Sequence, residues 1–496
     1  MESSTAGALD NAAIERDQLA LYTSSMTIPL APRPGRIRCT WVVLAAFLFG
    51  SCRTITQHIP SVGPPTEDEE VRISREFRRE AKKHFKFVTN PEVERYVDRI
   101  ARRILSATGP QSYDYRFFVV DDQQLNAFAV PGGSIYVFTG LIERAKSTDE
   151  LAGVLGHEIV HIKAKHMARS SGPDAISVLS LLSMILLARS TSGAQAAGVV
   201  GQAVAATRQA AYSRQLEMEA DTLGTRYMAA AGFDPKGALA FLKTLDQERA
   251  LNPIDVPAYI LSHPITQERV ANAELVVKSL GATQPRTEDS EALKKAQIII
   301  RMEHLNREAV VGEFEKLVEK NTNSPEQLYL LGFAQHQLGQ LGPAQKNYER
   351  SRQLRADNPG LQRDLGRLYA QTGNFNSARA AFDRAVALEP NEPLTYIYFG
   401  EFLEKSGDLR SAAGAYLNAQ NLAPLWDKPP YRLGLVYGKL DRFADGYYYL
   451  GRSFLLQDED EKAIADFERA LKIIGENTPR GQVIKEELKT LRERKR

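Results

Sequence analysis

The stretch LAGVLGHEIVHI, residues 151–162, decides how the rest of this chain is interpreted. Its only ionisable side chains are His157, Glu158 and His161, and an unpaired polar group among apolar ones costs roughly 2 to 7 kcal/mol. On an α-helix, histidines four residues apart lie one above the other on the same face. Two such imidazoles, with a carboxylate directly after the first, have the spacing of a zinc site in which the carboxylate is the general base.

A helix is expected across this stretch because Ser147 and Glu150 form an N-terminal capping box just before it. The alternative is that the two histidines belong to a polar helix face, since a pattern with three fixed positions also arises by chance. Apolar neighbours such as Val154, Ile159 and Ile162 favour the metal site, because a solvated face would not carry them. A third ligand further along the chain decides between the two.

The composition narrows the classes of function and of site. With 496 residues the chain is long enough for two or three domains. Its net charge of +2, without a long basic patch interleaved with aromatics, argues against nucleic acid as a partner. Cys39 and Cys52 are the only cysteines and lie near the N-terminus, so any metal in the folded part must be held by His, Glu and Asp.

The N-terminal segment is expected to be an export signal. Three arginines precede the apolar run Trp41–Phe49, which is much shorter than the about 20 residues that span a bilayer. The sequence LFGSC at 48–52 resembles a bacterial lipobox, which implies a lipid on Cys52, although Phe49 stands where leucine is usual. Met26 is the expected start, because it gives a leader of ordinary length. The alternative is a disordered tail with a chance apolar patch.

The pattern after the signal indicates an α+β domain. Helical spacing predicts two helices between residues 70 and 106, separated at Asn90-Pro91. The period then changes to two, which predicts three strands, at 115–120, 126–130 and 134–138. The expected boundaries are 1–52 for the signal, 53–69 for a linker, 70–285 for a peptidase domain and 290–496 for repeats.

Two uncharged runs, 175–188 and 193–206, follow the site helix. Each is too short to span a membrane, so we interpret them as a hydrophobic helical hairpin that forms core or gates the site, rather than one that rests on a membrane. A helix ended by Gly232 is expected over 208–231. The sequence Ser262-His263-Pro264 then places another histidine in a loop.

The chain is helical and repetitive from residue 290 to its end. Four glycines recur at an interval of 34 residues: Gly332, Gly366, Gly400 and Gly434. The residues that follow Gly366 and Gly400 match the tetratricopeptide pattern in register. After Gly434 the phase slips by half a unit, to Gly451, and residues 290–320 look like a degenerate first unit. Stacked helix pairs of this kind build a concave surface that binds other polypeptides.

A zinc peptidase needs three protein ligands and one open position. His166 lies five residues after His161, hence off the metal face, and we expect it to contact the helix C-terminus or solvent. The third ligand should be an acid on a later helix. Glu217 is the candidate, and Glu219 is its rival by spacing alone.

Four stretches carry a resemblance to a known family: Gly156–His161, Ser213–Asp221, Asn126–Gly133 and Ser262–Pro264. Together they resemble the gluzincin metallopeptidases related to the heat-shock protease HtpX, mitochondrial Oma-type proteases and the CAAX prenyl protease. The exported branch that carries tetratricopeptide repeats is similar over nearly all of residues 66–496, and its members are periplasmic proteases and chaperones involved in outer-membrane protein assembly. The resemblance implies a zincin-like α+β peptidase domain followed by an all-α tetratricopeptide-repeat solenoid.

The resemblance also implies that Glu217 is the third ligand of one zinc ion (Zn2+) per chain. Asp221, four residues on, can accept a hydrogen bond from a ligand imidazole, which favours Glu217 over Glu219. Glu158 is then the general base of amide hydrolysis. The strand next to the site in sequence is a candidate edge for an extended substrate, with bulk packing as the equal alternative. Its residues are Ser134, Ile135, Tyr136 and Val137.

His263 has three interpretations. As a fourth ligand it would displace the catalytic water and switch the enzyme off, and this is the role that we favour. As a hydrogen-bond donor to the developing oxyanion it would assist catalysis by roughly 2.7 to 4 kcal/mol. As an ordinary loop histidine it would be satisfied by solvent.

Two functions compete. The first is an exported zinc endopeptidase that hydrolyses unfolded or misassembled envelope proteins, which the repeats recruit together with assembly partners. The second is a chaperone or assembly scaffold for outer-membrane proteins with weak or gated proteolysis. Both place the chain in the periplasm of a Gram-negative-type bacterium, anchored to a membrane as a lipoprotein or, alternatively, soluble.

Overall fold

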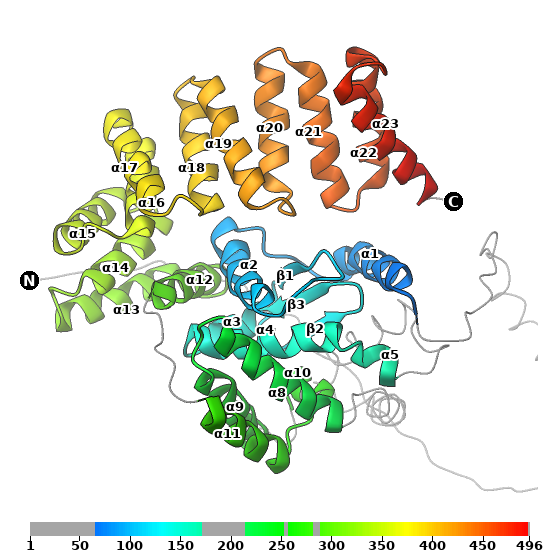
Figure 1. Cartoon of the computed structure of the whole chain (residues 1–496). Coiled ribbons are helices and arrows are strands. Elements are labelled where there is room, and N and C mark those ends of the chain that lie inside the picture. Colours follow the sequence, from blue (N-terminus) through cyan, green and yellow to red (C-terminus); the bar gives the residue numbers. More distant parts are fainter. Residues whose placement is uncertain (1–64, 171–213, 252–255, 281–287, 495–496) are drawn as a thin grey trace, which may run out of the picture. The chain divides into compact units, whose positions relative to one another are not determined.

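The chain continues from a mixed α and β part into a part built of helices only (Figure 1). The computed structural model describes residues 65–170, 214–251, 256–280 and 288–494. The mixed part contains α1 (Glu67–His84), α2 (Pro91–Ser106), β1 (Arg116–Val120), β2 (Ala127–Val130), β3 (Ser134–Phe138), α3 (Thr139–Arg144), α4 (Thr148–Lys163), α5 (His166–Ser170), α8 (Arg214–Ala230), α9 (Lys236–Leu251), α10 (Ala258–Ser262) and α11 (Gln267–Leu280).

The helical part contains α12 (Glu288–His304), α13 (Arg307–Lys320), α14 (Pro325–Gln337), α15 (Leu341–Leu354), α16 (Pro359–Gln371), α17 (Phe375–Leu388), α18 (Pro393–Lys405), α19 (Leu409–Leu422), α20 (Lys428–Lys439), α21 (Phe443–Leu456), α22 (Asp460–Ile474) and α23 (Pro479–Glu493). The predicted fold class, an α+β domain followed by an all-α repeat region, is confirmed.

Helix α4 begins where the capping residues predict. The Ser147 side chain accepts the Glu150 backbone N–H, and the Glu150 carboxylate accepts the Lys146 backbone N–H at 2.9 Å. From Leu151 to Ile162 every residue of α4 is buried. The helix therefore runs through the core, and the three ionisable side chains of this buried stretch have to find partners there.

The sheet has the strand order β1-β3-β2, with β3 parallel to β1 and antiparallel to β2. Strand β3 lies in the middle, its two edges are hydrogen bonded to its neighbours, and Ser134, Ile135, Tyr136 and Val137 are fully buried. The expectation that these residues offer an edge to a substrate is therefore wrong, and packing is their role. Position next to the site helix in sequence was a poor guide, because the antiparallel partner β2 occupies the outer position.

Strand β2 leaves one edge unpaired among the described residues. The Asn126 carbonyl accepts the Phe138 N–H, and backbone groups along an antiparallel strand point alternately toward and away from the partner. The N–H and C=O groups of Ala127 and Ala129 therefore point away from β3. Side chains on the two faces of β2 pack in different hydrophobic cores. Ala127 and Ala129 belong to the core that contains Ile135 and the apolar residues of α4, whereas Phe128 belongs to the core formed with α1.

Helices α4 and α8 pack backbone against backbone through Gly156 and Gly224. A Cβ atom at Gly224 would lie 2.8 Å from the carbonyl carbon of Gly156, and one at Gly156 would lie 2.8 Å from the carbonyl oxygen of Gly224. Since real Cβ atoms do not approach so closely, only glycine fits at either position. This contact brings the acidic face of α8 to the histidines of α4.

The repeat glycines pack on aromatic rings. A Cβ at Gly332, Gly366 or Gly400 would meet the aromatic ring 16 residues further on: Tyr348, Phe382 and Tyr416. Gly434 packs on Leu450 in the same way, and Gly451 on Phe467. Helix α21 thus closes the unit that α20 opens and also opens the unit that α22 closes. This double use of one helix explains the predicted half-unit slip.

Several predictions lie outside the described residues. These are the export signal with Met26 and Cys52, most of the linker 53–69, the hairpin over 175–206 and the start of the helix over 208–231, which is described from Arg214 as α8. No helix in the part of the chain that the structure describes is long and apolar enough to cross a membrane.

Candidate metal centre

Four buried side chains from three segments meet beside α4. His157 and His161 project from α4, Glu217 from the first turn of α8, and His263 caps the C-terminal end of α10. Their ligand atoms all lie within 4.8 Å of one another. We call these four residues the histidine cluster.

The distances within the histidine cluster fit one small ion. His157 Nε2 lies 2.9 Å from His161 Nε2 and 3.3 Å from His263 Nδ1. Glu217 Oε1 lies 3.0 Å from His263 Nδ1 and 3.5 Å from His161 Nε2. Donors about 2.0 to 2.1 Å from a tetrahedral zinc ion would be about 3.3 Å apart. The structure thus brings the three sequence-predicted ligands together and adds His263 as a fourth donor.

The other nitrogen of His157 is held by an acid that an arginine fixes in turn. His157 Nδ1 lies 3.0 Å from Asp221 Oδ1, as the i+4 spacing from Glu217 predicts. Arg269 donates two hydrogen bonds to Asp221, at 2.7 and 2.9 Å, and its third nitrogen lies 2.9 Å from Glu217. The same nitrogen reaches the His263 carbonyl at 3.3 Å. Arg269 therefore ties the acids of α8 to the loop that carries His263.

Electrostatics keeps Glu217 and His161, but not His157, in the forms that bind a metal ion. Burial raises the pKa of Glu217, but His263 and His157 outweigh it and hold that pKa well below its usual value. Burial, together with His157, holds the pKa of His161 well below its ordinary value. Burial alone would lower the pKa of His157, but hydrogen bonds with Asp221 and Glu217 raise it to about 10. A carboxylate and a neutral imidazole are the protonation states that bind a metal ion, so His157 has to release a proton when an ion binds.

Glu158 stands beside the cluster with its side chain fully buried. Its Oε1 lies 3.5 Å from His263 Nε2 and accepts a hydrogen bond from the Tyr259 hydroxyl at 3.3 Å. The Tyr259 ring also packs on the His263 ring, with centroids 4.6 Å apart. The carboxylate is therefore oriented by two groups from the α10 segment, which lies about a hundred residues further along the chain.

Sequence reasoning missed Arg269 and Tyr259. Arg269 lies six residues after His263 and Tyr259 four before it, so nearness to that histidine is the one signal that the sequence offers. Nothing in a single sequence shows that an arginine at the start of a helix will be buried.

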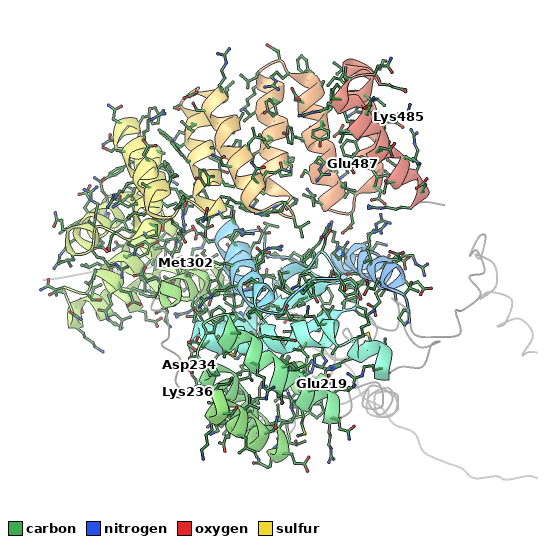
Figure 2. All side chains as sticks on the ribbon, viewed as in Figure 1. Glu219, Asp234, Lys236, Met302, Lys485 and Glu487 are labelled. Atoms are coloured by element: carbon green, nitrogen blue, oxygen red, sulfur yellow. The ribbon has the colours of Figure 1, made fainter. Side chains whose placement is uncertain are left out.

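Glu219 of α8 and His166 of α5 do not join the donor set. Glu219, labelled in Figure 2, pairs with Arg169 at 2.9 Å, which fits its rejection as the third ligand. His166 was expected to meet the helix C-terminus or solvent, but its ring is fully buried against His161.

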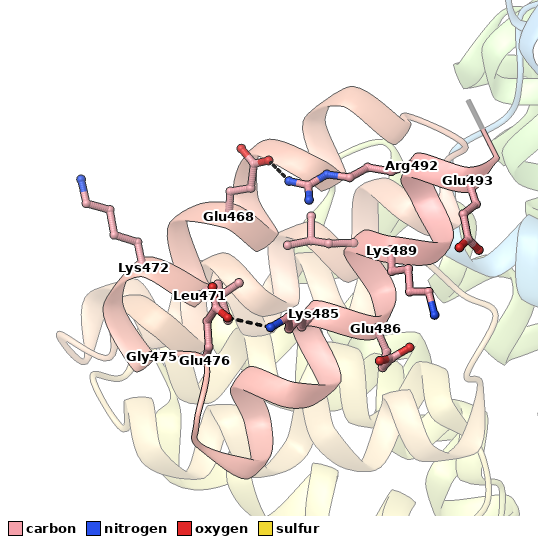
Figure 3. A pocket seen from close by; sticks show the side chains of 11 residues that line it. Glu468, Leu471, Lys472, Gly475, Glu476, Lys485, Glu486, Lys489, Arg492 and Glu493 are labelled. Atoms are coloured by element: carbon pink, nitrogen blue, oxygen red, sulfur yellow. Dashed lines mark hydrogen bonds and ion pairs between the residues drawn. The ribbon is translucent and has the colours of Figure 1, made fainter. Parts of the chain in front are cut away.

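A hollow of about 690 Å³ lies elsewhere, between α22 and α23 (Figure 3). Four of its charged residues form two ion pairs, Glu468 with Arg492 and Glu476 with Lys485, each at 2.7 Å. No histidine lines it. The hollow therefore offers no imidazole ligand for a metal ion, in contrast to the histidine cluster.

Comparison with known proteins agrees with this geometry. Residues 88–276 match the model of Peptidase family M48, and residues 335–396 match a tetratricopeptide repeat model. The chain is 27% identical to a putative beta-barrel assembly-enhancing protease of Vibrio cholerae serotype O1, over 51% of this chain and 54% of that relative. It is 31% identical to the beta-barrel assembly-enhancing protease of Escherichia coli strain K12, over 38% of this chain and 39% of the relative.

A third relative is the mitochondrial metalloendopeptidase OMA1 of Schizosaccharomyces pombe, which is 30% identical over 36% of this chain and 51% of its own length. The chain thus spans about half the length, or less, of these curated relatives. The family match includes all four residues of the histidine cluster and Glu158. Residues 88–276 are therefore similar to the metallopeptidases of family M48, and residues 335–396 to tetratricopeptide repeats.

Proposed function

We propose that this chain is a zinc-dependent endopeptidase that hydrolyses peptide bonds of unfolded or misassembled envelope proteins. The observation that carries the proposal is the convergence of four buried donors beside the Glu158 carboxylate. Similarity to metalloendopeptidases and to beta-barrel assembly-enhancing proteases supports it.

Zinc is the metal that the donor set fits best. Two or three imidazoles and one carboxylate match the N and O ligands of zinc, whereas calcium and magnesium take oxygen ligands almost alone. His157, His161 and Glu217 would hold the ion. Once bound, zinc supplies a Lewis acid for the attack of water on a peptide carbonyl.

The protein's own groups move the proton and orient the ligands. Glu158 takes a proton from the attacking water and delivers it to the leaving amine. Tyr259 holds the Glu158 carboxylate through its hydroxyl, and Asp221 fixes the ring of His157 with Nε2 toward the ion.

Substitution of Glu158 tests the reaction. In Glu158→Gln the amide cannot accept the water's proton, so casein hydrolysis should fall by roughly 10² or more while zinc content stays near one per chain. Hydrolysis within a few-fold of the wild type would remove Glu158 from the role of general base. A chelator should abolish hydrolysis in the wild type.

We infer that the substrate adds to β2 as an extended strand. Ala129 points its backbone N–H and C=O away from β3 and lines a small cavity together with the ligand His161. Proline is tolerated where an edge N–H faces away from the sheet. Ala129→Pro should therefore keep the fold and raise KM for casein about tenfold, and an unchanged KM contradicts the assignment.

His263 is proposed as the switch that closes the site. A catalytic zinc site keeps one open position, but the four donors of the histidine cluster would complete a tetrahedron. With zinc bound in this way, His263 would have to move away before a water could take its position. His263→Ala should raise casein hydrolysis without altering zinc content, whereas a hundred-fold loss would assign it to oxyanion stabilisation instead.

The same proposal includes a location and partners for the chain. We propose export to the periplasm of a Gram-negative-type bacterium with a lipid on Cys52, for which mass spectrometry of the mature N-terminus is the test. The repeats would recruit client proteins or assembly partners, since stacked helix pairs bind polypeptides. The alternative is a chaperone or scaffold with gated proteolysis, and it gains support if Glu158→Gln retains full activity in outer-membrane protein assembly.

A further inference from the structure

His166 is a buried histidine outside the donor set, and it contacts a ligand. Helix α4 ends at Lys163, and Lys165 adopts a left-handed conformation with φ 50°, which turns the chain so that His166 begins α5. His166 Nδ1 lies 2.9 Å from His161 Nδ1, and the two rings meet edge to face at a centroid distance of 4.9 Å. On a continuous helix, the five-residue spacing would place His166 away from the face that carries His161. The turn at Lys165 brings the two rings into contact.

The hydrogen bonds have one consistent direction. His161 turns Nε2 toward His157 and Glu217, so this nitrogen offers its lone pair to the ion and Nδ1 carries the hydrogen. His161 Nδ1–H then donates to His166 Nδ1. The hydrogen of His166 must therefore sit on Nε2, which faces a carboxylate oxygen of Glu219 at 3.4 Å.

Each of the two ligand histidines of α4 thus contacts a short series of side chains that ends at an arginine, and we call this series its outer chain. His157 contacts Asp221 directly, and Asp221 is held by Arg269. His161 contacts His166, and Glu219 beyond it pairs with Arg169 at 2.9 Å. The first chain is buried throughout, whereas the second reaches the surface, where the Arg169 side chain is 50% exposed.

We propose that His166 is a positioning residue for the metal ligand His161, and that Glu219 acts on the same ligand through His166. The inference rests on the proposed metal site. A partner on the outer nitrogen fixes the tautomer and the ring orientation of a ligand histidine, and losing such a partner typically costs 10- to 100-fold in metal affinity.

A residue that only fills space would behave differently, and two substitutions separate the roles. Asparagine carries its amide oxygen where histidine has Nδ1, so His166→Asn keeps an acceptor for His161. Glutamine places its amide nitrogen near the position of Nε2, so His166→Gln can still reach Glu219 but loses the acceptor. Glutamine is the closer match to histidine in size.

The experiment measures the zinc affinity of the full chain by competition with a chromophoric chelator. We expect His166→Ala to bind zinc 10- to 100-fold more weakly, His166→Gln to resemble it, and His166→Asn to stay within a few-fold of the wild type. Glu219→Ala should bind zinc a few-fold more weakly, but its metal site should still be filled at saturating zinc. Glu219→Gln, which can still accept from His166, should remain close to the wild type.

A matched control is His336 in α14, which is also buried and bonds to Gln371 at 3.0 Å, in the repeat region. His336→Asn should leave zinc affinity unchanged. The proposal is overturned if His166→Ala binds zinc as the wild type does, or if His166→Gln binds zinc as well as or better than His166→Asn. Because affinity is measured without substrate, a chain that binds zinc as expected but cleaves nothing would contradict the proposed function and leave this inference standing.

Discussion

Two buried groups of ionisable residues in this molecule differ in how their charges and hydrogen-bonding atoms are arranged. The ion-pair cluster consists of Glu92, Lys295, Arg363, Asp364 and Arg367 and joins α2, α12 and α16. In it, the Lys295 ammonium lies 3.1 Å from Glu92 and 2.8 Å from Asp364, and Arg363 lies 3.2 Å from Glu92. Every contact joins a cation to an acid, so the charges compensate one another.

The histidine cluster brings acceptors together instead. His157 Nε2 lies within hydrogen-bond distance of both His161 Nε2 and His263 Nδ1. A single proton on His157 Nε2 can be shared with only one of these two nitrogens. Such a set suits a metal ion at its centre, whereas the ion-pair cluster is already neutralised by its own lysine and arginines. Burial and charge alone therefore do not mark a functional site, whereas converging lone pairs do.

The largest difference between the clusters should be in metal content. We expect His157→Ala, His161→Ala and Glu217→Ala each to lose zinc, because three ligands are needed to hold the ion. Asp364→Ala and Glu219→Ala should keep about one zinc per chain at saturating zinc. Elemental analysis of the purified variants measures this, and a Glu217→Ala protein with full zinc would show that the ligand assignment is wrong.

The ion-pair cluster should matter for stability. Asp364→Ala leaves the buried Lys295 without one of its acids, and removing one partner of a buried pair costs about 3 to 5 kcal/mol in the free energy of unfolding. Urea unfolding measures this loss. The matched control is the pair Arg301–Glu313, in which Arg301 is partly exposed and Glu313 is exposed, and Glu313→Ala should cost about 0 to 1 kcal/mol. Equal losses in both variants would mean that burial does not strengthen the cluster.

Removal of zinc should lower the free energy of unfolding only in variants whose histidine cluster is intact. At a free zinc concentration 100 times Kd, the ion adds about 2.7 kcal/mol to the free energy of unfolding, provided that the unfolded chain does not bind it. A chelator should remove this increment from the wild type and equally from Asp364→Ala. It should change nothing in His161→Ala, and a chelator effect on that variant would point to a second metal site.

The smallest effect is the pH dependence of the ion-pair cluster near neutrality. Burial alone would raise the pKa values of Asp364 and Glu92, but Lys295 and Arg363 outweigh it and lower both. A lowered pKa contributes stability that is present above the unfolded values of about 3.9 and 4.3, and that is lost as pH falls through the lower folded values. The stability difference between the wild type and Asp364→Asn should therefore be constant from about pH 5 to 8 and shrink below about pH 4.

Local signals predicted most of the fold. The capping residues Ser147 and Glu150 start α4, the change of period marks the strands, and the glycine interval marks the repeats. Each of these depends on residues a few positions apart. The middle position of β3 was not predictable in this way, because strand order is set by packing between distant segments.

The candidate site divides in the same manner. The spacing of His157, Glu158 and His161 is a property of one helix and is visible in the sequence. The approach of His263 and the burial of Arg269 depend on where α10 and α11 pack, and no periodicity records that. His166 was misplaced because a helix was assumed to continue through Lys165, where the backbone turns.

The contact between Gly156 and Gly224 has a thermodynamic consequence for metal uptake. Two backbones in van der Waals contact set the separation of α4 and α8 before any ion arrives, so binding does not have to order or draw together the helices. Metal–ligand distances tolerate deviations of about 0.2 Å, which is much less than the width of a methyl group. A Gly224→Ala substitution would thus push α4 and α8 apart and weaken the metal site without removing a single polar atom.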